Sequence, residues 1–182
     1  TKTLLSAVCT TSVLLFASQV AAQVSITPLA SFGTNGWLAP GSTPYLTTGN
    51  TERGLACNPL TGNLVLVARQ NVAGVSNNVR LFDGQTGADL GGFDNTNIAG
   101  GTFPMNMVDI AEDGAIYVCN LSTSGASPFK VYRWDSELLG PLLPPTAVYD
   151  GLSGLGRTGD AFAVQGGSLA NPVQFAAAGG TT

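Results

Sequence analysis

"RGLACNPLTGNLVLVAR" (residues 53–69) and "NMVDIAEDGAIYVCN" (residues 106–120) share one arrangement, and the second begins 53 residues after the first. Each stretch holds an apolar run, a tight turn and a second apolar run, which is the pattern of a β-hairpin. The turns, "NPLTGN" and "AEDGA", contain the Gly, Asn and Asp that tolerate unusual backbone angles. The sequence therefore predicts two equivalent hairpins at a constant interval.

The interval occurs a third time, because residues 52–57, 105–110 and 158–163 align at steps of 53 residues. In the first two copies a third strand ("VRLFD", "FKVYRWD") and a fourth ("GADLGGF", "TAVYDGL") follow the hairpin. Four short antiparallel strands per unit, repeated in series, are typical of β-propeller blades, which stack to bury their faces. We therefore predict an all-β, β-propeller-like fold. A β-sandwich and an unclosed stack of sheets remain open as alternatives.

The repeat divides the chain into expected units. Residues 23–52 would supply a lead-in strand and the outer strand of a preceding blade, residues 53–105 blade 1, residues 106–158 blade 2, and residues 159–182 the start of a truncated blade 3. Propellers typically have about four to eight blades, so these units cannot close a ring. The sequence is thus expected to be a fragment of a longer propeller.

Residues 1–22 have the features of an export signal. Lys2 precedes an apolar stretch from Leu4 to Ala17, and Val20-Ala21-Ala22 fits a small-x-small cleavage pattern. We predict a signal peptide cut after Ala22 and a mature protein that is secreted or held at the cell surface. No later apolar run is long enough to span a bilayer, so no membrane span is expected in the mature chain.

Charge and composition exclude several functional classes. The chain has 7 basic and 11 acidic residues, a net charge of −4, and no basic cluster, so no nucleic-acid partner is expected. It contains no histidine, which removes Ser-His-Asp and Cys-His catalysis and histidine-based zinc sites. No catalytic residue is assigned.

Four polar residues lie at or near the starts of the repeats' first strands: Arg53, Asn106, Asp109 and Asp160. In a propeller these innermost strands line the central channel and their ends meet at one mouth. The four residues are our candidates for binding at that mouth, and the alternative is that they only meet water. No metal ligand and no cofactor is predicted, although carboxylates and amides there leave a divalent cation open.

Two cysteines remain after signal removal, Cys57 and Cys119. An exported protein often pairs its cysteines, and the alternative is two buried thiols. The aromatic residues Trp37, Phe103, Trp134 and Tyr149 either belong to the core or form a stacking platform for sugar rings.

Residues 36–180 resemble a family of exported bacterial propeller-like domains of unknown function (DUF4623-like). The stretches that carry the resemblance are "WLAPGSTPYLTTGNTERGLACNPLTGNLVLVAR", "GGTFPMNMVDIAEDGAIYVCNLS" and "FKVYRWD". The resemblance implies a propeller-like fold and an extracellular setting, since members often sit in large surface proteins, some with C-terminal sorting tails. It supplies no activity and no catalytic residues.

These observations lead to two functional hypotheses. The first is a non-enzymatic extracellular propeller module that acts as a scaffold or as a binding surface for a protein or a glycan. The second is a metal-assisted propeller enzyme, of the lactonase or polysaccharide lyase type, that uses the polar residues of the inner strands.

Overall fold

The computed structural model describes residues 27–69, 79–168 and 170–180, and in them all regular structure is β, as predicted. The predicted signal peptide, residues 1–22, lies outside the described residues. Across the described part of the chain, no helix has the length and apolar character needed to cross a membrane.

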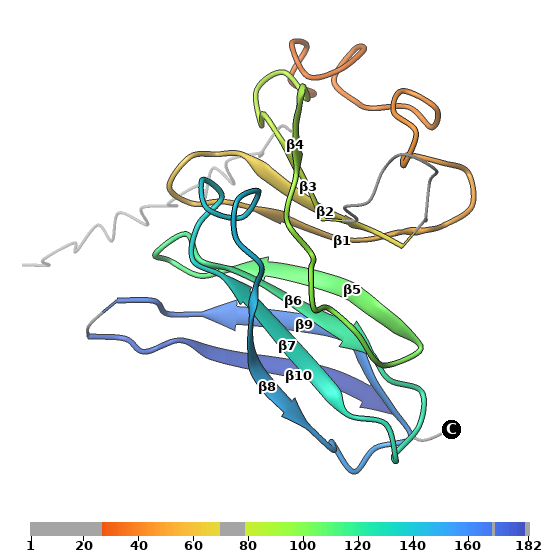
Figure 1. Ribbon diagram of the computed structural model, residues 1–182. Coiled ribbons are helices and arrows are strands. Elements are labelled where there is room, and N and C mark those ends of the chain that lie inside the picture. Colours follow the sequence, from red (N-terminus) through yellow and green to blue (C-terminus); the bar gives the residue numbers. More distant parts are fainter. Residues whose placement is uncertain (1–26, 70–78, 169, 181–182) are drawn as a thin grey trace, which may run out of the picture.

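Two four-stranded antiparallel sheets and a two-stranded hairpin make up the fold (Figure 1). The strands of the first sheet are β1 (Glu52–Cys57), β2 (Leu64–Ala68), β3 (Val79–Phe82) and β4 (Asp89–Gly92). Those of the second sheet are β5 (Phe103–Ile110), β6 (Ile116–Leu121), β7 (Phe129–Trp134) and β8 (Thr146–Gly151). The hairpin pairs β9 (Arg157–Gln165) with β10 (Gln174–Gly180). In both sheets each strand pairs with its neighbour in sequence, so the predicted four-stranded antiparallel repeat is confirmed.

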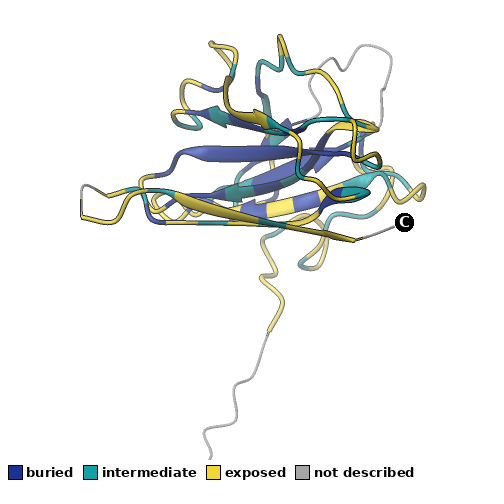
Figure 2. Ribbon diagram, turned by 90° about the horizontal axis from the view of Figure 1, so that it is seen from below, coloured by how far each residue is buried: buried dark blue, intermediate teal, exposed yellow. Residues whose placement is uncertain are grey.

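The second sheet lies between the first sheet and the hairpin (Figures 1 and 2), and both faces of its central strands β6 and β7 are covered, whereas β8 is mostly exposed. Val65 and Val67 of β2 meet Val118 of β6 in the core between the two sheets. On the other face of β6, Tyr117 and Cys119 meet the hairpin. Alternation along the strand therefore supplies two cores, and all six residues of β6 are buried.

Residues 27–51 differ from the prediction of a lead-in strand and the outer strand of a preceding blade. They form turns and isolated bridges, because prolines and glycines with positive φ, such as Gly33 and Gly41, interrupt any extended run. The segment nevertheless packs against the first sheet. Its Tyr45 is buried in a third apolar cluster with Leu66 and Phe82, on the face turned away from the second sheet.

The "NPLTGN" turn joins β1 to β2 through a short network of hydrogen bonds. The Asn58 N–H donates to the Asn63 carbonyl (2.8 Å), and the Asn58 Oδ1 accepts from the Leu60 N–H (3.0 Å). Gly62 has φ +77°, a conformation that side chains disfavour. Gly114, φ +81°, has the same role in the shorter turn between β5 and β6.

Glu137, in the connection between β7 and β8, holds this turn against the second sheet. Its carboxylate accepts hydrogen bonds from Asn58 Nδ2 (3.0 Å), Thr61 Oγ1 (3.0 Å) and Asn63 Nδ2 (2.9 Å). All three donors come from the turn, more than 70 residues away in sequence. Glu137 therefore connects the two sheets at the end where their inner hairpins turn.

We expect Glu137→Ala to lower the free energy of unfolding by about 2 kcal/mol, because three side-chain donors lose a charged acceptor. Urea unfolding followed by far-UV circular dichroism measures this change. Glu112→Ala is the matched control, since Glu112 is exposed, and it should shift stability by less than about 0.5 kcal/mol. Equal unfolding midpoints for the two variants would show that Glu137 contributes nothing.

Candidate functional site

The first strands of the three sheets, β1, β5 and β9, lie side by side, since β1 contacts β5 and β5 contacts β9. The approach of β1 to β5 is very close. A Cβ added to Gly54 would lie 2.4 Å from the backbone nitrogen of Val108. Residues on successive inner strands can therefore meet.

Each inner strand breaks register with its partner at the corresponding position of the repeat. On β1, Arg53 and Gly54 lie between the pairs Glu52–Ala68 and Leu55–Leu66. On β5 the break covers residues 104–106, and on β9 it covers residues 159–160. Such β-bulges bend a strand and redirect its side chains, and they are frequent next to functional sites. Three of the four predicted residues, Arg53, Asn106 and Asp160, lie in these bulges.

Asn106 links two of the bulges to a residue that follows β2. It is buried, its Nδ2 donates to the Gly159 carbonyl, and its Oδ1 accepts from the Arg69 guanidinium. Arg53, Asn106 and Gly159 are equivalent positions of the 53-residue repeat. The amide thus connects β5 to β9 and to the residue that follows β2.

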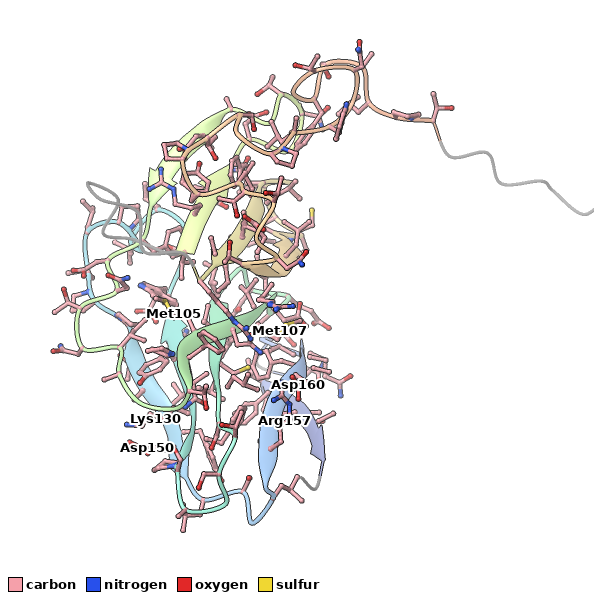
Figure 3. The ribbon with its side chains drawn as sticks, turned by 90° about the vertical axis from the view of Figure 1, so that its right-hand side faces the viewer. Met105, Met107, Lys130, Asp150, Arg157 and Asp160 are labelled. Carbon is pink, nitrogen blue, oxygen red and sulfur yellow. The ribbon has the colours of Figure 1, made fainter. Side chains whose placement is uncertain are left out.

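Asp160 forms a two-point ion pair with Arg157, through Nε to Oδ2 (2.5 Å) and Nη2 to Oδ1 (2.6 Å). Figure 3 shows these side chains together on β9, on the opposite side of the molecule from Lys130 and Asp150. Hydrogen bonds from Arg157 lower the pKa of Asp160 below its ordinary value, and the charges of Arg69 and Arg53 lower it further. Asp160 is therefore held as a carboxylate within a group of arginines.

Arg69 follows β2 and lies among the same residues. Its guanidinium carbon lies 3.9 Å from the centre of the Phe103 ring, a cation–π contact. Burial lowers the pKa of Arg69, and so do the positive charges of Arg53 and Arg157, whereas Asp160 raises it. Arg53, Arg69 and Arg157 form, with Asn106 and Asp160, what we call the arginine cluster.

Arg69 and Arg157 were not among the site residues predicted from the sequence. A usable signal was present, because three of only seven basic residues fall at the ends of inner hairpin strands. Arg69 also aligns with Ser122 at the repeat spacing, and the backbone of Ser122 forms a bridge to Thr158 at the start of β9. Both residues therefore contact the next inner strand along the chain.

Asp109 does not join the arginine cluster. Its Oδ1 accepts from the Ile110 N–H (2.9 Å) and its Oδ2 accepts from the Val164 N–H on β9 (2.7 Å). The carboxylate thus attaches the hairpin to the second sheet, three residues further along β5 than Asn106. Asp109 therefore lies between β5 and β9 and outside the bulges.

The carboxylates that the sequence offered to a divalent cation are occupied by other partners. Asp160 is paired with Arg157, and Asp109 accepts from two backbone N–H groups. Within the described ranges, no three His, Cys, Asp or Glu residues gather in one place. These residues do not fit a cation site.

Cys57 and Cys119, the pair that could form a disulfide, are free thiols in the structure. Cys57 is exposed on the face of β1 that is turned away from the second sheet, with Ala56 on the inward face. Cys119 points from β6 toward the hairpin, and burial raises its pKa to about 12. Cys57 lies on the face of the first sheet that is turned away from the second sheet, and Cys119 lies on the face of the second sheet that is turned away from the first. Since the mean planes of stacked sheets lie about 10 Å apart, the two thiols are too far apart to bond.

The four aromatic residues for which the sequence left a core role and a stacking platform open do not form one surface. Trp134 is buried in the core between the sheets, whereas Trp37 is 58% exposed on the N-terminal segment. Phe103 lies beneath Arg69, and Tyr149 packs against Phe129 and Phe175. The four residues have separate surroundings.

The comparison with solved structures found a structural likeness. The chain is similar to a DUF4623 family protein from Bacteroides eggerthii. The identity is 24%, the TM-score is 0.48, and the match covers 62% of this chain and 26% of that one. This is the resemblance that the sequence predicted, and the chain spans about a quarter of the length of the protein it matches. No known family and no curated protein matches the sequence.

Proposed function

We propose that this chain forms part of a β-propeller, and that the propeller acts outside the cell as a non-enzymatic scaffold or binding surface for a protein or a glycan. The observation that carries the proposal is the recurrence of a β-bulge at one position of β1, β5 and β9. Because these strands are neighbours, the bulges bring polar side chains from successive sheets to one place on a rigid frame.

The outer face of the first sheet and the outer face of the hairpin support the proposal of a propeller. On the outer face of the first sheet, Leu55, Leu66 and Phe82 line an apolar hollow of about 170 Å³. On the hairpin, Ala163 and Ala176 are paired and exposed on the outer face, because their neighbours Phe162 and Val164 pack toward the second sheet. Further sheets added at both ends would cover these side chains, as adjacent blades do in a propeller.

The chemistry of the bulges favours binding over catalysis. Asp160 is ion-paired and its pKa is lowered, so it is a poor general acid. Asn106 is buried and uses both ends of its amide to hold neighbouring residues. A preorganised set of donors with no free base is suited to recognising a ligand group.

Affinity electrophoresis through gels that contain a panel of neutral and acidic polysaccharides tests this function. We expect retarded migration in at least one gel, and no release of reducing ends or unsaturated products when the same polysaccharides are incubated with the protein. Product release that a chelator abolishes would contradict the proposal and establish the metal-assisted enzyme instead.

A further inference from the structure

Two guanidinium groups of the arginine cluster have no anionic partner. Asp160, the carboxylate of the cluster, is occupied by Arg157 through two hydrogen bonds. Arg53 and Arg69 form no ion pair in the part of the chain that the structure describes. Three positive charges therefore surround one negative charge, and the cluster carries an excess of positive charge.

Arg69 is positioned in advance of any ligand. The Phe103 ring lies against its guanidinium, and the buried amide of Asn106 accepts from one of its terminal nitrogens. The Nε of Arg69 is also buried and has no hydrogen-bond partner among the described residues. A buried N–H without an acceptor is costly, so an acceptor supplied by a ligand would be favourable.

Arg53 supplies a second, more adaptable donor. It is exposed and lies in the β1 bulge, which frees its side chain from the regular alternation of the strand. Arg53 lies beside Arg69 in the sheet, because Glu52 pairs with Ala68 and the Arg69 N–H donates to the Thr51 carbonyl (2.9 Å). The pKa of Arg69 is lowered first by burial and then by the charges of Arg53 and Arg157. A bound anion would relieve this repulsion, and guanidinium groups match the geometry of planar and tetrahedral oxyanions.

We propose that Arg53 and Arg69 bind one oxyanion, a carboxylate or sulfate group of an acidic sugar, at the inner-strand bulges. The inference rests on the proposed binding function and names the ligand group. The net charge of the protein restricts the class of ligand further. With a net charge of −4 and a pI near 4.4, the protein repels an extended polyanion, so a ligand with isolated negative charges fits better than a nucleic acid.

Isothermal titration calorimetry with D-glucuronate tests the inference, and D-glucose is the neutral control of the same ring size. We expect glucuronate to bind, glucose not to bind, and the affinity for glucuronate to fall as NaCl is raised. Arg53→Gln should weaken glucuronate binding about tenfold or more, because it removes a charged donor and keeps most of the side-chain volume.

Arg133→Gln is the matched variant, since it removes the same charge from β7, where Arg133 pairs with Asp135. It should leave the affinity for glucuronate within about twofold of the original value. Titrations with sodium sulfate and sodium acetate distinguish recognition of an acidic sugar from recognition of any small oxyanion. Tighter binding of glucuronate identifies an acidic sugar, whereas equal binding of all three anions supports recognition of the oxyanion alone and overturns the sugar assignment.

Three results would overturn the oxyanion site itself: no heat with any anion, equal binding of glucose and glucuronate, or an unchanged affinity in Arg53→Gln. A neutral polysaccharide distinguishes loss of the anion site from loss of the proposed binding function. If a neutral polysaccharide retards the original protein and Arg53→Gln equally, the binding module stands and the anion site does not.

Discussion

Gly159→Ala is expected to lower the free energy of unfolding by about 4 kcal/mol, from backbone strain and overpacking together. Gly159 has φ +103°, a conformation that alanine rarely adopts. A Cβ there would lie 2.1 Å from the carbonyl oxygen of Asn120 and 3.3 Å from the Phe129 ring. Relief of the contact would require β9 to move away from the second sheet. Urea unfolding followed by circular dichroism measures the loss.

Gly125→Ala is the control for this variant. The nearest atom to a Cβ at Gly125 is 3.5 Å away, and the residue does not have a positive φ. Its stability should change by less than about 0.5 kcal/mol. If Gly159→Ala were as stable as Gly125→Ala, the close approach of β9 to β6 would be refuted. The same result would remove the basis for placing Asp160 beside Arg69.

Trp134→Ala should destabilise the protein by about 3–5 kcal/mol, the range for removing a large aromatic side chain from a core. Trp134 is 2% exposed, its ring packs edge-on against Phe93 at 5.6 Å, and its Nε1 donates to the Asp94 carbonyl (2.9 Å). The substitution therefore leaves a cavity between the two sheets and an unpaired carbonyl.

The second tryptophan of the chain supplies the comparison. Trp37→Ala removes an equal volume from a largely exposed position and should change stability by less than about 1 kcal/mol. Thermal unfolding of the two variants, recorded side by side, separates burial from residue type. A larger loss for Trp37→Ala than for Trp134→Ala would mean that the N-terminal segment, and not the space between the sheets, holds the main core.

Much of the fold could be predicted from sequence because strand signals are local. Alternating apolar residues, Gly and Asn at turns, and the 53-residue interval identified the strands of both sheets. Residues 27–51 were predicted less well. Their apolar residues suggested strands, but positive-φ glycines and prolines make turns there.

The candidate site was predicted only in part. The sequence placed Arg53, Asn106 and Asp160 at or near the starts of the repeats' first strands, and all three lie in the bulges of those strands. Asp109 has the same kind of sequence environment, but it turns to the Val164 N–H, because β5 has regained its register at that point. Register beyond a bulge depends on the partner strand, which the sequence of one strand does not reveal.

The sequence by itself determined the strand order, the two-faced character of the strands and the repeat, since each depends on residues close together in the chain. Only the tertiary structure decided that Arg69 and Arg157 join Arg53, that Glu137 holds the "NPLTGN" turn, and that the cysteines stay apart. These contacts join residues from different sheets. They depend on how the sheets stack and on where the inner strands bulge. Whether a side chain of one sheet contacts a residue of another is therefore decided only when the sheets pack together.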